Sequence, residues 1–317
     1  MTLDLPAQLD AYLALRVALG LPTHATRLLL QQFVGYLDHH HPGAAPIRTQ
    51  SVIAWACGGT PPRSAAAQTT RLSVARGFLR HLRASAPETE IPDRHLLAAP
   101  RRPPPFLFSA PDLGRLLAAA ATLRPHGSLR PQTYGTVFGV LAATGLRVSE
   151  ALSLQCADVH LTDPPPRLLI QRTKFGKTRW VPVHATTAAR LRAYAQSRRA
   201  QHVAGLSETF FLSNGGQPLT YGAVHRTFQR LMQRLAITPR PGQRRPTLHA
   251  LRHTFAVARL TAWYRAGADV RALAPTLSVY LGHVDPAMSY WYLTATPELL
   301  GAAAERFQRY VATGGAA

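Results

Sequence analysis

Apolar residues recur at helical spacing in four stretches of the first hundred residues. The stretches cover residues 5–20, 23–40, 49–58 and 64–85. Leu, Val, Phe and Tyr repeat there every three or four positions, as expected for helices with one buried face. The chain up to residue 100 is therefore predicted to form a small helical domain.

A proline-rich connector follows these helices. Residues 99–113 read APRRPPPFLFSAPDL, and three consecutive prolines favour a stiff, extended backbone. We place the domain boundary here, with one domain over residues 1–100 and a second over residues 101–317. Ser109 is the predicted N-cap of the next helix, with Asp112 in its first turn.

The second domain is mainly helical but changes period once. Residues 133–145 are apolar nearly all round, which predicts a buried helix. The β-prone runs 167–171 and 179–183 flank a polar turn with Gly176, which predicts a hairpin. Further helices are expected at residues 109–123, 147–154, 186–199, 221–235, 247–267 and 297–311. The predicted fold class is mainly α, a helical N-terminal domain followed by an α+β domain.

The charge of the chain narrows its function. Its 36 basic and 15 acidic residues give a formal net charge of +21, and the excess runs through the whole sequence. Such a field favours a polyanionic partner, with nucleic acid as the first candidate. A basic surface that only keeps the protein soluble is the alternative. The Arg-rich stretches RLSVARGFLRHLR and HRTFQRLMQR are candidates for phosphate contacts.

Cysteine and histidine usage argues against a metal or disulfide framework. Cys57 and Cys156 lie far apart and form no CxxC pair, which fits a reducing cytoplasm. His39, His40 and His41 are consecutive at a predicted helix end, so their side chains should fan out into solvent instead of converging on a metal.

No membrane association is expected. The first twenty residues carry acids early and no basic segment, unlike a signal peptide. The longest apolar run, residues 134–146, is shorter than the ~20 residues that a bilayer-spanning helix needs.

Lysine is used only in the predicted hairpin turn. Lys174 and Lys177 are the only lysines among the 36 basic residues. Arginine is effectively never deprotonated, with a pKa above ~12, whereas lysine has an ordinary pKa near ~10.4 that its surroundings readily shift. A basic residue that must give up a proton therefore cannot be arginine. Ordinary solvated turn residues are the alternative, and the hairpin alone does not decide.

Three further stretches together decide between these two interpretations of the lysines. ATGLRVSEAL contains Arg147 and Glu150, HALRH contains His249 and Arg252, and LGHVDPAMSYWYL contains His283 before three aromatic residues. With the lysine hairpin, these motifs and their order resemble the tyrosine recombinase (phage-integrase and Xer-like) family over nearly the whole chain. The resemblance implies an N-terminal core-binding, SAM-like helical domain and a catalytic domain of the DNA breaking-rejoining type.

The resemblance implies roles for the basic residues. Arg147 and Arg252 would grip the scissile phosphate, since their planar, always-charged forks suit its non-bridging oxygens. Lys174 would protonate the leaving 5′-oxygen, while Lys177 would contact a phosphate. Glu150 would orient the helix that carries Arg147; taken alone, the spacing of the two residues favours a surface ion pair instead.

The resemblance also implies a tyrosine nucleophile. Tyr292 lies nine residues after His283, the family's offset, and would form the 3′-phosphotyrosine link. Tyr290 is the rival, and on a helix it would point about 200° away from Tyr292. His249 would assist proton transfer or hold the phosphate, and His283 would donate a hydrogen bond to the phosphate or pack beside it.

A site-specific recombinase or integrase is thus the expected function. The resemblance implies double-stranded DNA as the partner, a tetramer on DNA, no metal or other cofactor, and a cytoplasmic, nucleoid-associated protein. Partner recombinases are a further candidate, as is docking of the terminal helix on a neighbouring copy instead of its own domain. The alternatives are a type IB topoisomerase, a non-catalytic DNA-binding protein and an RNA-binding protein.

Overall fold

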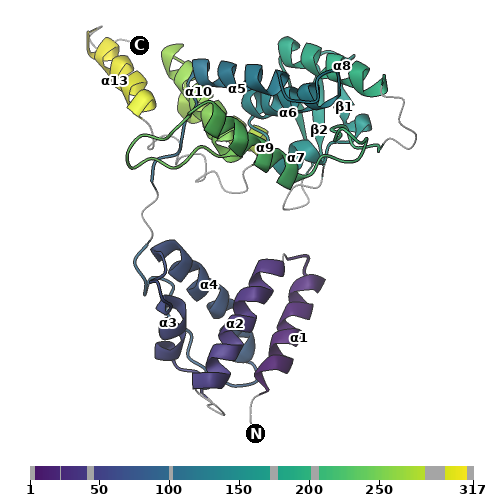
Figure 1. The fold of residues 1–317 in the computed structure, drawn as a ribbon. Coiled ribbons are helices and arrows are strands. Elements are labelled where there is room, and N and C mark those ends of the chain that lie inside the picture. The colour runs from purple at the N-terminus through teal and green to yellow at the C-terminus, as the bar shows by residue number, and fades with distance from the viewer. Residues whose placement is uncertain are drawn as a thin grey trace. The chain divides into compact units, whose positions relative to one another are not determined.

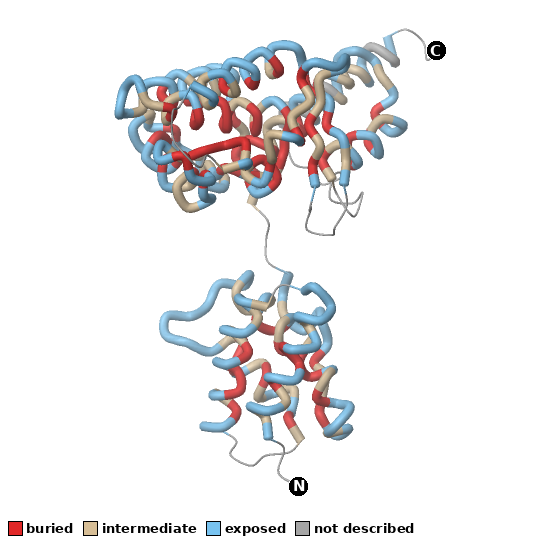
Figure 2. The backbone as a smooth tube through the Cα atoms, turned by 90° about the vertical axis from the view of Figure 1, so that its right-hand side faces the viewer, coloured by how far each residue is buried: buried red, intermediate tan, exposed pale blue. Residues whose placement is uncertain are grey.

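The computed structural model describes residues 4–21, 23–40, 46–99, 103–171, 178–200, 207–282 and 297–312. The chain divides into two compact units, Met1–Arg102 and Pro103–Ala317 (Figure 1). Each unit has its own hydrophobic core, and the buried residues gather in the interior of each (Figure 2). The described part is mainly helical with one small antiparallel sheet, which confirms the predicted fold class.

The first unit consists of α1 (Leu5–Ala18), α2 (His24–His40), α3 (Thr49–Cys57) and α4 (Ala65–Leu82). Side chains of Asp4 and Ser64 accept the capping hydrogen bonds that begin α1 and α4. The periodic apolar positions of all four helices form one core, centred on residues such as Leu13, Phe33 and Phe78. The helices predicted from hydrophobic spacing are therefore confirmed.

In the second unit, α5 (Ala110–Ala121), α8 (Ala185–Arg199) and α10 (Leu248–Arg265) pack against α6 (Arg130–Thr144). The α6 residues are buried on nearly every side, as their composition predicts. The other helices in the described part of this unit are α7 (Val148–Leu152), α9 (Tyr221–Arg234), α11 (Val270–Leu281) and α13 (Pro297–Ala312), with the 3₁₀ turn η1 (Cys156–Asp158). Ser109 Oγ accepts from Asp112 N at 3.1 Å, so the predicted N-cap of α5 is confirmed.

The sheet has the order β1–β2–β3 and is antiparallel throughout. Its strands are β1 (Val159–His160), β2 (Arg167–Ile170) and β3 (Arg179–Pro182). Leu168 pairs with Val181 and Ile170 with Arg179, so the predicted hairpin strands pair in register. Leu168, Ile170 and Val181 point into the core, whereas Trp180 lies on the exposed face.

Part of the predicted connector belongs to the second unit. Phe106 and Phe108 are buried in its core, and Phe108 N donates to Thr254 Oγ1 at 2.9 Å. Arg244 N donates to the carbonyl of Pro104 at 3.1 Å. The extended chain is thus held to the second unit from residue 104 onward, because its aromatic residues contribute to the core.

The helix α11 is absent from the sequence prediction. Pro275 lies inside it and removes a backbone donor, which normally argues against a helix. Asp269 offsets this at the N-terminus, since its side chain accepts from the backbone of Arg271 and Ala272. Burial of Val270, Ala274, Leu277 and Leu281 supplies the rest of the stabilisation.

The terminal helix α13 packs against α10 of its own chain. Arg306 Nη1 donates to the carbonyl of Ala268 at 2.7 Å. Leu300, Phe307 and Val311 nevertheless remain more than half exposed. The helix therefore folds back on its own domain.

Candidate active site

The helix α7 begins directly after a tight turn that places Arg147. Gly145 ends α6 with φ 64°, a left-handed conformation that glycine adopts without strain. A Cβ at Gly145 would lie 2.6 Å from Phe255 Cδ1 and 2.9 Å from Leu281 Cδ2. The glycine of the TGLR motif is thus required by both conformation and space, and it brings Arg147 to the start of α7.

Arg147 is held by Glu150 in a buried corner. Arg147 Nη1 donates to Glu150 Oε1 at 2.7 Å, and Arg147 N donates to Glu150 Oε2 at 3.0 Å. The side chain of Glu150 is 5% exposed, whereas that of Arg147 is 26% exposed. The alternative of a surface ion pair is therefore wrong. Arg147 keeps an accessible edge while its carboxylate partner is buried.

A third participant, Arg179, was missed by the sequence motifs. Its Nη2 and Nη1 donate to Glu150 Oε2 and Oε1 at 2.9 and 3.2 Å, and its side chain is 10% exposed. Arg179 opens β3 and shares its inward face with buried Val181. Strand alternation was the signal that could have revealed it, because a charged residue on a buried face needs a partner.

These contacts set the charge state of Glu150. Burial alone would raise the pKa of the carboxyl group, but the hydrogen bonds and charge of Arg179, together with the hydrogen bonds of Arg147, outweigh it. The net result is a pKa below the ordinary glutamate value. Glu150 is therefore ionised at neutral pH and its two arginine partners outnumber it in charge.

The C-terminal end of α11 collects the arginines. Arg147 Nη2 donates to the carbonyl of Gly282 at 2.9 Å, and Arg179 Nε donates to that of Tyr280 at 2.9 Å. Arg252 Nη2 donates to the carbonyl of Leu281 at 2.7 Å. The last carbonyls of a helix lack intrahelical donors, and cations near them are favourable. Three segments that are distant in sequence thus meet at the glycine of the LGH motif.

Arg252 is 1% exposed, from the interior-facing side of α10. Its Nη1 donates to the carbonyl of Gly145 at 2.8 Å, in addition to its bond with Leu281. Arg252 therefore ties the turn before Arg147 to the end of α11. The structure brings Arg147 and Arg252, both predicted from the motifs, to the same place.

His249 lies one turn before Arg252 and His253 on α10. Its ring centroid is 4.5 Å from that of His253, with the rings edge to face. The pKa of His249 is lowered to about 4. The largest cause is partial desolvation of its ring by neighbouring residues, followed by the positive charges of Arg252, Arg147 and Arg244. The residue is still exposed to solvent. His249 is consequently neutral at physiological pH and able to accept a proton.

Four of the other predicted residues fall outside the described ranges. These are Lys174 and Lys177 in the hairpin turn, and His283 and Tyr292 after α11, together with the rival Tyr290. Gly282, the last described residue before His283, lies where Arg147, Arg179 and Arg252 meet, a group called the arginine cluster below. The predictions for these residues stay predictions.

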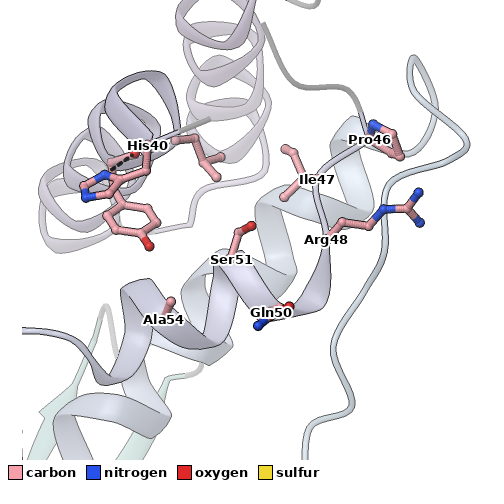
Figure 3. A pocket seen from close by; sticks show the side chains of 9 residues that line it. His40, Pro46, Ile47, Arg48, Gln50, Ser51 and Ala54 are labelled. Carbon is pink, nitrogen blue, oxygen red and sulfur yellow. Dashed lines mark hydrogen bonds between the residues drawn. The ribbon is translucent and has the colours of Figure 1, made fainter. Parts of the chain in front are cut away.

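A pocket of about 570 Å³ lies in the first unit between α2 and α3 (Figure 3). Its lining includes His40, Ile47, Arg48 and Ser51, and none of the predicted catalytic residues.

His39 and His40 are both exposed, and the His40 ring stacks on Tyr36 with centroids 4.2 Å apart. Over the described ranges, no group of three or more His, Cys, Asp or Glu side chains could hold a metal. None of the described helices is long and apolar enough to cross a membrane.

Residues 108–298 match the model of the phage integrase family. They cover more than half of the chain, and include Arg147, Glu150, His249 and Arg252. The chain belongs to the phage integrase family. The arginine cluster is therefore the candidate active site of a tyrosine-type site-specific recombinase.

Relatives extend the match over nearly the full length of this recombinase. The integrase/recombinase y4rB of Sinorhizobium fredii is 40% identical, over 94% of this chain and 95% of its own. Tyrosine recombinase XerD of Yersinia pestis is 30% identical, over 86% of both chains. Both matches thus extend into the first, helical unit as well as the second unit.

Solved recombinases share the fold of this chain. The XerH site-specific recombinase bound to difH superposes with a TM-score of 0.69 at 17% identity, over 89% of this chain and 78% of that one. The Tn1549 transposon integrase in complex with transposon right end DNA gives a TM-score of 0.66 at 17% identity, over 96% and 99%. The fold expected for the family is therefore confirmed.

The structure also corrects one expectation about DNA contacts. Arg71, in the Arg-rich stretch of α4, is 5% exposed and its guanidinium lies 3.7 Å from the ring centroid of Trp55. Arg80, in the last turn of the same helix, and its C-cap Arg83 are exposed. Arg71 is therefore a core residue, whereas Arg80 and Arg83 remain available for phosphate.

Proposed function

We propose that this recombinase cuts and rejoins double-stranded DNA at a specific site through a 3′-phosphotyrosine link to Tyr292. The meeting of Arg147 and Arg252 at the C-terminal end of α11 supports the proposal most directly. At the residue before His283, Arg147 offers an accessible edge to a phosphate, and the buried Arg252 adds a second fixed positive charge beside it. Arginine side chains in general keep their positive charge throughout the physiological pH range.

The proposed cleavage step is a transesterification. The Tyr292 oxygen attacks the scissile phosphorus and forms the P–O bond, while the bond from phosphorus to the 5′-oxygen breaks. Lys174 gives a proton to the leaving 5′-oxygen, and the tyrosine proton passes to neutral His249 or to solvent. The reverse reaction with a new 5′-hydroxyl rejoins the strand. Because the ester conserves the bond energy, ATP is not needed.

The arginines would act on the charge that develops during this step. Fixed donors stabilise a developing charge best when they need no reorganisation at the moment of reaction. Arg147 is held on two sides by Glu150 and Gly282, yet 26% of its side chain is exposed. We propose that this edge contacts one non-bridging oxygen of the phosphate. The buried Arg252 would stabilise the charge on the second non-bridging oxygen.

We further propose that residues 1–100 form the core-binding DNA-binding domain and residues 101–317 the catalytic domain. Solved relatives of the same fold are bound to DNA substrates, and the net charge of +21 suits a DNA backbone. A tetramer on DNA, built of two dimers, and a cytoplasmic, nucleoid-associated location complete the proposal. DNA affinity should fall steeply with salt, and a nearly flat salt response would contradict it.

Covalent trapping tests the chemistry directly. Wild type, Tyr292→Phe and Tyr290→Phe are incubated with nicked duplexes from the ends of the protein's own genetic element and compared on SDS gels. We expect an adduct that disappears only in Tyr292→Phe. Loss only in Tyr290→Phe would move the nucleophile by two residues. Tight, specific binding with no adduct from any form on several nicked sites would favour a non-catalytic DNA-binding protein.

The lysine assignment has its own test. Lys174→Arg keeps the positive charge but cannot give up a proton at neutral pH, so DNA binding should remain and cleavage should fall by about 10²–10⁴-fold. Lys177→Arg is the matched control from the same turn and should cleave nearly normally. Normal cleavage by Lys174→Arg would rule out the general-acid role.

A further inference from the structure

The Arg179 side chain donates hydrogen bonds to four acceptors in two other segments of the chain. Its Nη1 and Nη2 bind the two oxygens of Glu150, while Nε and Nη2 reach the carbonyls of Tyr280 and Leu281 at 2.9 and 3.2 Å. All three nitrogens are used. One side chain from β3 thus joins the start of α7 to the end of α11.

Glu150 is shared between the two arginines. Its Oε1 accepts from Arg147 Nη1 at 2.7 Å and from Arg179 Nη1 at 3.2 Å. Its Oε2 accepts from Arg147 N at 3.0 Å and from Arg179 Nη2 at 2.9 Å. A carboxylate bound at four points has no freedom to rotate, so Arg179 fixes the group that orients Arg147.

Sharing also preserves the charge that a phosphate requires. If Glu150 paired with Arg147 alone, one negative charge would offset the one positive charge offered to DNA. With Arg179 on the same carboxylate, the three side chains carry a net positive charge. Attraction falls with distance and is strongest where water is excluded, so this surplus acts on a phosphate at the exposed edge of Arg147.

The backbone around Arg179 is shaped to receive it. Gly282 has φ 69°, and a Cβ there would lie 2.6 Å from Arg179 Nη1. Only glycine leaves room for the guanidinium against the carbonyls that end α11. The planar fork is also needed, since the three donors of a lysine ammonium cannot match four acceptors lying in this arrangement.

We propose that Arg179 is a positioning residue for DNA cleavage: it immobilises Glu150 and the end of α11, and thereby aims the Arg147 guanidinium at the scissile phosphate. The inference rests on the proposed function of Arg147. Arg179 itself uses all three guanidinium nitrogens on Glu150 and the end of α11, so it would act on the DNA through Arg147.

The test uses Arg179→Lys, with Arg167→Lys as the matched control. Arg167 opens β2 in the same sheet, is partly buried and stacks on Trp180, but makes no contact with Glu150. Single-turnover adduct formation is measured on an ordinary duplex and on one with a methylphosphonate at the scissile position. That substitution removes the negative charge of the phosphate, so it reduces the need for a well-aimed guanidinium.

On the ordinary duplex, Arg179→Lys should form adduct about 10²-fold more slowly than wild type, with DNA affinity unchanged within about twofold. On the methylphosphonate duplex, the ratio to wild type should recover by about tenfold or more. Arg147→Lys should show the same recovery. Arg167→Lys should cleave both substrates like wild type.

Equal defects of Arg179→Lys on both substrates, or cleavage as fast as in Arg167→Lys, would overturn the proposal. Recovery in Arg147→Lys without recovery in Arg179→Lys would overturn it while leaving the proposed function intact. Absence of any wild-type adduct would instead count against the proposed function.

A double variant covers the case in which Arg179→Lys does not fold. Glu150→Gln/Arg179→Gln removes both charges of the buried pair, which proteins tolerate better than an unpaired charge. Positioning predicts a folded protein that still cleaves slowly on the phosphate and recovers on the methylphosphonate. Wild-type cleavage by the folded double variant would overturn the proposal.

Discussion

The two units bury arginine in opposite ways. In the first unit, Arg71 packs on the face of Trp55 and donates to neutral acceptors, Gln32 Oε1 and the carbonyl of Trp55, each at 3.1 Å. In the second unit, Arg179 binds a buried carboxylate and the carbonyls that end a helix. The first arrangement connects helices of one small core. The second joins three distant segments around an accessible guanidinium.

The surroundings explain the difference in function. Burial, with a smaller contribution from the charge of Arg63, lowers the pKa of Arg71, and its Nε is buried without a hydrogen-bond partner in the described structure. In the first unit, the packing of Arg71 on Trp55 outweighs the cost of burying its charge. The second unit instead uses complementary charge, which fixes direction as well as position. Arginine in the second unit therefore fixes the geometry of the site.

The largest effect should come from Glu150→Ala, which releases Arg147 and Arg179 together. Cleavage should fall by about 10²–10³-fold, because the phosphate donors lose their preorganisation. The free energy of unfolding of the second unit should fall by about 3–5 kcal/mol, because a buried ion pair loses one partner. Single-turnover cleavage and denaturant unfolding measure the two effects.

Glu90→Ala is the control for this prediction. Glu90 also binds an arginine, Arg48 at 2.9 Å, but it lies in the first unit and its side chain is 40% exposed. Its loss should leave the cleavage rate at saturating DNA unchanged. If Glu150→Ala behaved like this control, the buried network would have no part in the reaction.

Arg71→Met should have a moderate effect confined to the first unit. It removes the stacking on Trp55 and two hydrogen bonds, at a cost of about 1–2 kcal/mol in the free energy of unfolding of that unit. Cleavage at saturating DNA should not change. Arg80→Met, at an exposed position of the same helix, should stay within about 0.5 kcal/mol of wild type. A cleavage defect in Arg71→Met at saturating DNA would contradict the view that Arg71 contributes only to the stability of the first unit.

The pH dependence of stability should differ between the wild type and Glu150→Gln. The pKa of Glu150 is lowered in the folded protein, so its ionised form stabilises the second unit above the ordinary glutamate pKa. That contribution should be lost as the pH falls below the ordinary value and through the lowered one. Glu150→Gln should lack this loss. Unfolding titrations from neutral to acid pH compare the two, and identical acid profiles would contradict the shift.

The smallest effect concerns the protonation of His249. Its pKa should be about 4 in the free protein. Bound DNA should raise it, because phosphate charge opposes that of the surrounding arginines. Histidine-labelled NMR titrations, assigned with His249→Asn, measure both values. An ordinary pKa near ~6.5 in the free protein would contradict the desolvation and the arginine charges described here.

Local pattern was sufficient for most of the fold. Helical spacing predicted α1 to α4, all-round apolarity predicted the burial of α6, and β-prone runs predicted the paired strands β2 and β3. The pattern failed at α11, where Pro275 argues against a helix that tertiary burial nevertheless stabilises. It also failed to distinguish Arg71 from Arg80, because the spacing of arginines along a helix does not say how much neighbouring helices cover.

The candidate site was predicted only in part. Arg147, Glu150, His249 and Arg252 are recognisable because motif and spacing keep each pair on one short segment. Arg179 carries no such signal beyond strand alternation, since its partners Glu150, Tyr280 and Leu281 come from other segments. Lys174, His283 and Tyr292 lie outside the described ranges, so their roles stay predictions.

By itself, the sequence determined the helical character, the basic charge, the family and the residue types available for phosphate chemistry, because these depend on composition and short-range spacing. The tertiary structure decided which arginine is core and which is part of the site. Burying a guanidinium requires acceptors, and whether a ring, a carboxylate or the end of a helix supplies them depends on segments that meet only after folding.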